Sequence, residues 1–128
     1  MYNSSWYMNL IRPYLAPPNW IFAPVWTFLY VIIFASLALF ILSDAVDKKI
    51  GYTFFIIQML LNILWTPVFF GLKSILGALI VVILLDIFVF LTMYKFFQAS
   101  KLAGLLLIPY FIWILFATYL NIGYLILN

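Results

Sequence analysis

The sequence predicts an all-α protein, a bundle of four transmembrane helices. Of its 128 residues, 70% are hydrophobic and only 7% are charged, whereas roughly a quarter of the residues in a soluble domain are charged. Four apolar stretches of about 20 residues or more alternate with short polar turns, and a helix needs this length to cross a bilayer. Because such a chain could not cover its surface with polar groups in water, we expect a lipid bilayer around it.

Residues 1–19 are expected to form an interfacial loop or lid and not a span. The segment is shorter than a membrane crossing, and prolines break it because they cannot continue a helical hydrogen-bond ladder. Its aromatic side chains suit the boundary between lipid and water. The prolines are Pro13, Pro17 and Pro18, and the aromatic residues include Trp6, Tyr7 and Tyr14.

The first spanning helix is predicted over residues 20–43. Two starting points are open. Either Asn19 caps the helix and Pro24 kinks its first turns, or Pro24 is itself the first helical residue. From Pro24 to Ser43 a helix rises about 30 Å, which is enough to cross. The polar loop 44–51 ends it.

Three further spans are predicted over residues 52–70, 75–97 and 102–127. Pro67 should bend the first of these near its end, before a cap at Gly71. Ser74 is a candidate cap for the next span, and Pro109 interrupts the hydrogen bonding of the last. Since no repeat or linker divides the chain, residues 1–128 are predicted to be a single domain.

The residue types that are missing exclude several kinds of chemistry. The chain has no Cys, so it offers no disulfide or thiolate, and no His, the commonest metal ligand and general base. Its acids, Asp44, Asp47 and Asp86, form no catalytic or metal-binding set. The net charge is +3, and the basic residues form no cluster, so nucleic acid is not an expected partner. No metal or cofactor is expected to be required.

The basic residues indicate an orientation in the membrane. With four spans, the loop 44–51 and the turn near residue 100 lie on one side, and the N-terminal segment and the turn near residue 73 lie on the other. Cytoplasmic ends of spans carry an excess of Lys and Arg. The first side carries Lys48, Lys49, Lys95 and Lys101 against Arg12 and Lys73 on the second, which favours the first side as cytoplasmic.

Aromatic side chains gather in the half of the membrane beneath residues 1–19, on single faces of three helices. The predicted faces, which also include non-aromatic residues, are Trp26 and Tyr30 on the first helix; Asn62, Trp65 and Phe69 on the second; and Trp113, Ala117 and Leu120 on the fourth. Aromatic walls with a few polar groups suit a flat hydrophobic ligand. The alternative is ordinary helix packing, with Asn62 and Asn121 as hydrogen-bonding groups between helices.

Asp86 lies near the middle of the third span, where an acid is costly and usually faces the protein interior. It could couple proton movement, contact a ligand, or remain as a neutral acid bonded to Thr92 or to a freed carbonyl. Because no basic side chain lies within the spans near this depth, the neutral, structural role is favoured.

Four blocks of aromatic, proline and asparagine residues run in order along nearly the whole chain. They are Trp6-Tyr7 with Pro13; Pro17 to Trp20 with Pro24 to Tyr30; Leu61-Asn62 with Trp65, Pro67 and Phe69 to Gly71; and Pro109 to Trp113 with Phe116 to Asn121. In this order they resemble the TspO/MBR family, the tryptophan-rich sensory and translocator proteins. The resemblance implies a membrane bundle of five spans whose first span should precede Trp6, where this sequence predicts none.

The resemblance also implies a pocket for porphyrins, sterols or benzodiazepine-type ligands under the N-terminal segment. It assigns polar ligand contacts to Trp26 and Asn62, and it matches Trp26 and Trp113 to a pair implicated in light-dependent porphyrin breakdown. Thr53 and Ile57 replace small residues that the family associates with dimer contact, so a homodimer is left open. The residues predicted to bind ligand are Phe22, Trp26, Tyr30, Asn62, Trp65, Phe69, Trp113, Ala117 and Leu120.

These observations predict a membrane-embedded binding or sensory protein for porphyrins or sterols, which it would regulate or transport. The alternative is a proton-coupled exporter of small molecules that uses Asp86. A binding protein is favoured over an enzyme, with porphyrin as its ligand. The expected location is a bacterial cell membrane, with the mitochondrial outer membrane as the alternative.

Overall fold

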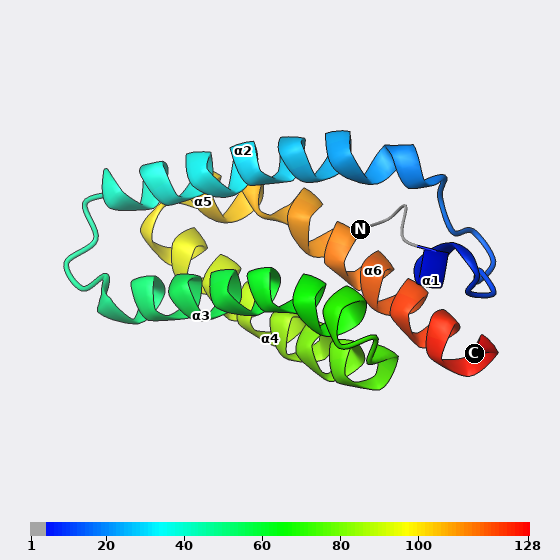
Figure 1. Cartoon of the computed structure of the whole chain (residues 1–128). Coiled ribbons are helices and arrows are strands. Elements are labelled where there is room, and N and C mark those ends of the chain that lie inside the picture. The colour runs from blue at the N-terminus through cyan, green and yellow to red at the C-terminus, as the bar shows by residue number, and fades with distance from the viewer. Residues whose placement is uncertain (1–4) are drawn as a thin grey trace.

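Four long helical segments run side by side in the computed structural model, which describes residues 5–128 (Figure 1). Residues 1–4 of the predicted lid lie outside the described range. In chain order the elements are α1 (Ser5–Met8), η1 (Asn19–Ile21), α2 (Phe22–Ile41), α3 (Lys49–Thr66), η2 (Pro67–Gly71), α4 (Ile75–Ala99), α5 (Lys101–Leu106) and α6 (Ile108–Leu127). The segments long and apolar enough to cross a membrane are Asn19–Ile41, Lys49–Gly71, Ile75–Ala99 and Lys101–Leu127. The predicted fold class, a four-span membrane bundle, is confirmed.

The helix α4 is the centre of the bundle. It packs against α3, α5 and α6, whereas α2 packs mainly against α5 and to a lesser degree against α6. The buried core runs along these contacts and includes Ile33 of α2, Val89 of α4 and Ile114 of α6. The helix α1 and the C-terminus lie at one end of the bundle, and the α2–α3 loop lies at the other (Figure 1).

The first span begins with the single turn η1, and α2 continues from Phe22, so the helix starts before Pro24. The side chain of Asn19 does not cap it; its Oδ1 atom accepts a hydrogen bond from Arg12 Nη1 at 3.0 Å. Pro24 lies in the first turn of α2, where its missing N–H group costs no intrahelical bond. The proposed cap and the proposed start at Pro24 are therefore both wrong.

Prolines mark the places where the other helices depart from regular α geometry. At Pro67 the chain widens into η2, a π-helical turn in which the Leu72 N–H bonds to the Pro67 carbonyl at 2.9 Å. Gly71 does not adopt the expected left-handed cap; Lys73 adopts positive φ (53°) instead. The last span is broken at Leu107 into α5 and α6. A single helix over this region was predicted. Pro109 has no N–H group to donate to the Leu105 carbonyl, and a new helix, α6, begins at Ile108.

Two short contacts fix the ends of the helices. The predicted cap at Ser74 is confirmed, because its Oγ accepts a hydrogen bond from the Gly77 N–H at 3.0 Å. Gly104 brings α5 against the end of α4, and a Cβ atom there would lie 2.7 Å from the Phe97 Cα. A larger residue at 104 would push α5 away from α4.

Candidate ligand-binding site

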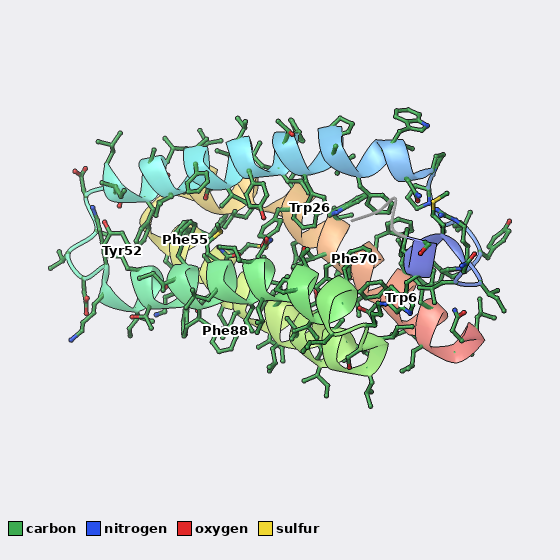
Figure 2. All side chains as sticks on the ribbon, viewed as in Figure 1. Trp6, Trp26, Tyr52, Phe55, Phe70 and Phe88 are labelled. Carbon is green, nitrogen blue, oxygen red and sulfur yellow. The ribbon has the colours of Figure 1, made fainter. Side chains whose placement is uncertain are left out.

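A small cavity lies among the long helices at the end of the bundle that α1 covers. Its volume is about 50 Å³, which holds a few water molecules at most. Its wall includes Trp26, which Figure 2 shows on the inner side of α2. The lining residues are Tyr7, Phe22, Trp26, Asn62, Trp65, Phe69, Val82, Leu85, Trp113, Ile114, Ala117, Leu120, Asn121 and Tyr124.

Aromatic rings pack edge to face and face to face around this cavity. The Trp65 and Phe69 rings stack with centroids 4.9 Å apart, one turn apart across the α3–η2 junction. Phe22 of α2 meets Trp113 of α6 edge-on at 6.0 Å. The contacts are favourable aromatic geometries, so the cavity is walled by aromatic side chains that pack against one another.

The N-terminal segment covers the cavity through buried aromatic contacts. Tyr7 is 4% exposed, and its hydroxyl accepts a hydrogen bond from Tyr124 OH at 3.0 Å. The neighbouring Trp6 ring packs edge-on against Phe69 at 5.4 Å. Residues 5–8 thus connect α6 to η2 directly over the cavity (Figure 2, Trp6 and Phe70).

The rest of this segment is bound to the C-terminal half of α6. Pro13 is buried against Gly123, where a Cβ atom would come within 2.4 Å of the proline Cβ. Asn128 makes two hydrogen bonds to the backbone of Ile11, to its N–H at 3.0 Å and to its carbonyl at 3.1 Å. The lid is held at several points along its length.

A chain of hydrogen bonds passes behind the cavity and links three helices. Tyr30 OH donates to Asn62 Oδ1 at 2.5 Å, and Asn62 Nδ2 donates to Tyr110 OH at 2.8 Å. Tyr110 OH in turn donates to Gln58 Oε1 at 2.8 Å. Within residues 5–128 the Trp26 indole makes no hydrogen bond to Asn62, and it is Tyr30, one turn further along α2, that reaches the amide oxygen.

Asn121 connects the other side of the site. Its Oδ1 accepts a hydrogen bond from Trp65 Nε1 at 3.0 Å, and its Nδ2 donates to the Ile75 carbonyl at 3.0 Å. Both asparagines therefore join helices, as the packing alternative expected. Within residues 5–128, the indole N–H of Trp113 is buried without a hydrogen-bond partner, although its ring lines the cavity.

Of the nine residues predicted to bind ligand, Tyr30 alone is not on the cavity wall, because it lies behind Asn62. Sequence reasoning missed six of the lining residues: Tyr7, Val82, Leu85, Ile114, Asn121 as a wall residue, and Tyr124. Tyr124 could have been found, since it extends the stripe of Trp113, Ala117 and Leu120 by one turn. Val82 and Leu85 belong to an aliphatic face with no distinguishing signal.

Asp86 is bonded to Thr118 on α6 and does not line the cavity. Thr118 Oγ1 lies 2.6 Å from Asp86 Oδ2 and 2.8 Å from the Ile114 carbonyl. The expected partner, Thr92, instead donates to the Phe88 carbonyl of its own helix. Within residues 5–128, the other carboxyl oxygen of Asp86 is buried without a partner. No group of three potential metal ligands occurs in the same described range.

Comparison with known proteins identifies close similarity over nearly the whole chain. A family model described as TspO/MBR family matches residues 1–127. A tryptophan-rich protein TspO of Chlorobaculum tepidum is 43% identical over 129 residues, covering 98% of this chain and 81% of that protein. A tryptophan-rich sensory protein of Cereibacter sphaeroides is 42% identical over 123 residues, covering 96% and 77%. The translocator protein of Homo sapiens is 34% identical over 123 residues, covering 91% and 70%.

Proposed function

The chain belongs to the TspO/MBR family, and we propose that it is a membrane receptor for flat hydrophobic molecules, porphyrins or sterols. The ligand would occupy the cavity beneath the N-terminal segment. One observation carries the proposal: tryptophans from three helices, Trp26, Trp65 and Trp113, line a single cavity under a covering segment. Indole rings give large flat contact areas and a polar edge, which suits a conjugated or fused-ring ligand.

Binding requires the cavity to expand. Pockets that hold small molecules usually measure about 300–1,000 Å³, whereas this cavity measures about 50 Å³. The covering segment and the stacked pair Trp65–Phe69 must therefore move when a porphyrin enters. This requirement fits a sensory role, because ligand binding would then change the position of residues 5–18 at the membrane surface.

The polar groups at the wall favour ligands that carry hydrogen-bond acceptors. The Trp113 indole N–H has no partner within the described chain, and Asn62 Nδ2 uses one of its two hydrogens on Tyr110. Both groups donate. A carboxylate or carbonyl on the ligand would satisfy a buried donor that otherwise costs free energy.

The test is a titration of the purified protein with protoporphyrin in which tryptophan fluorescence reports binding. Trp113→Phe keeps an aromatic ring but removes the unpaired N–H and one emitter near the ligand. We expect weaker porphyrin binding and reduced quenching in this variant. The matched control is Trp20→Phe, because Trp20 is 73% exposed and does not line the cavity. Identical titrations for both variants would remove Trp113 from the site.

A further inference from the structure

A second cavity opens at the opposite end of the bundle, between the α2–α3 loop and the last turn of α4. Its volume is about 220 Å³, and it shares no residue with the first cavity. Tyr52, whose ring packs against the floor residue Phe40, marks this end in Figure 2. The lining residues are Phe40, Ala45, Asp47, Ile50, Gly51, Lys95, Gln98 and Ala99.

The floor of this cavity is a rigid aromatic surface. Phe40 is 2% exposed and stacks on Phe96 with centroids 4.2 Å apart and planes within 8°. Gly51 allows the ring to stand directly against α3, because a Cβ atom at 51 would lie 2.5 Å from the Phe40 Cζ. The packing of Phe40 therefore keeps the base of the cavity apolar and fixed.

The rim carries opposite charges with unused hydrogen-bonding capacity. Within residues 5–128, no hydrogen bond or ion pair engages the Lys95 ammonium or the Gln98 amide. Asp47 uses Oδ1 to accept the Lys49 backbone N–H at 3.1 Å, and its second oxygen is unengaged in the same range. The adjacent Lys48 is different, since its ammonium donates to the carbonyls of Ile41 and Ser43 at the end of α2.

The charges are ordered along the membrane normal. Lys95 lies one turn, about 6 Å, inside the end of α4 at Ala99, whereas Asp47 lies in the loop beyond the helix ends. The positive group is therefore nearer the hydrocarbon, and the negative group is nearer the water. In a phospholipid with an amine headgroup, the phosphate is on the glycerol side and the ammonium extends outward, so the two charge orders are complementary.

We propose that this cavity binds a phosphoethanolamine group, with its phosphate on Lys95 and Gln98 and its primary ammonium on Asp47. A lysine ammonium binds phosphate as a point charge, and a carboxylate accepts the N–H groups of an ammonium. The volume corresponds to roughly seven water molecules at their liquid volume, which is enough for a small headgroup and too large for a single ion. The site is independent of the ligand cavity and of the function proposed for it.

Native mass spectrometry of the full chain, released from detergent with lipids of identical acyl chains, tests the assignment. We expect phosphatidylethanolamine to be retained about tenfold more than phosphatidylglycerol, because Asp47 faces an ammonium in one case and no cation in the other. Phosphatidylcholine, whose ammonium has no N–H group to donate, should be retained less. Equal retention of phosphatidylethanolamine and phosphatidylglycerol would overturn the proposal.

Variants separate the two halves of the site. Asp47→Asn should remove the preference for phosphatidylethanolamine over phosphatidylglycerol, and Lys95→Gln should reduce retention of every phospholipid. Matched controls are Asp44→Asn and Lys101→Gln, which change the same charges at the same end of the bundle but do not line the cavity. Controls that lower retention as much as the cavity variants would show general surface electrostatics and contradict the proposal.

Competition with soluble glycerophosphoethanolamine identifies the source of the group. If the soluble compound displaces the lipid at comparable concentration, the cavity recognises the headgroup itself, whatever carries it. If only the lipid binds, the acyl chains contribute, and the source is the bilayer. Either result keeps the phosphoethanolamine assignment, whereas soluble glycerophosphoglycerol competing equally well would refute it.

Discussion

At the scale of single residues, Asn62 is bonded on two sides before any ligand is present. It accepts from Tyr30 of α2 and donates to Tyr110 of α6. Its position on the cavity wall was predictable from the stripe it shares with Trp65 and Phe69. Its partners were not, because they depend on the rotation of α2 and α6 about their axes, which packing determines. Tyr30 was placed on the wall for the same reason.

Replacing Asn62 should cost stability because two tyrosine hydroxyls lose a partner. Asn62→Leu keeps the approximate volume, and we expect the free energy of unfolding to fall by about 1–2 kcal/mol. Tyr30→Phe removes one of the two bonds and should cost about half as much. Unfolding in a denaturing detergent measures both. An unchanged midpoint for Asn62→Leu would show that the network contributes nothing to stability.

Asp86 should be protonated at neutral pH. Thr118 has one hydroxyl proton but two acceptors within reach, Asp86 Oδ2 at 2.6 Å and the Ile114 carbonyl at 2.8 Å. A protonated Asp86 would satisfy both contacts, because the acid could then donate to Thr118 while Thr118 donates to the carbonyl. An ionised group would also leave a buried carboxylate oxygen without a partner in an apolar medium. We expect an infrared carbonyl band of a protonated acid that disappears in Asp86→Asn.

A carboxylate band at neutral pH would contradict this state of Asp86. The variant Asp86→Asn also tests the exporter alternative, because it should leave proton flux in vesicles unchanged. Proton-coupled uptake that Asp86→Asn abolishes would support the exporter instead.

At the scale of elements, hydropathy and prolines predicted the spans. Contacts between residues far apart in the sequence determine where a span is interrupted and how the covering segment is held. Pro67 and Pro109 were recognised as interruptions, but the interruption at Leu107 depends on how α5 packs against α2 and α4. An interfacial loop or lid over residues 1–19 was predicted from their aromatic and proline content. The contacts that hold them, such as Pro13 on Gly123, join positions far apart in the chain and leave no local pattern.

The covering segment should loosen when Gly123 is enlarged. In Gly123→Ala the new Cβ would lie 2.4 Å from the Pro13 Cβ, whereas nothing lies within 4 Å of a Cβ at Gly71. We expect Gly123→Ala to raise both association and dissociation rates of a porphyrin several-fold, because the segment opens more often. Gly71→Ala is the matched control. Stopped-flow fluorescence measures the rates, and equal rates in the two variants would argue against a covering role.

At the scale of the whole molecule, the bundle has two chemically different ends. One end carries the aromatic cavity and the segment that covers it. The other end carries more basic than acidic residues: Lys48, Lys49, Lys95 and Lys101 against Asp44 and Asp47. The four-span membrane class followed from composition and hydropathy alone. The second cavity did not, because Asp47 and Lys95 are distant in sequence and meet only when the α2–α3 loop folds over the end of α4.

The central claim is that the cavity beneath the N-terminal segment is the ligand site, and filling it tests this most directly. Ala117 is the smallest side chain on the wall, so Ala117→Leu places three additional carbons into the space a ligand would use. The control Ala38→Leu makes the same change on an exposed position of α2. We predict that protoporphyrin affinity, measured by fluorescence titration, falls at least tenfold in Ala117→Leu, and remains at the wild-type value in Ala38→Leu. Wild-type affinity in a correctly folded Ala117→Leu would contradict the account.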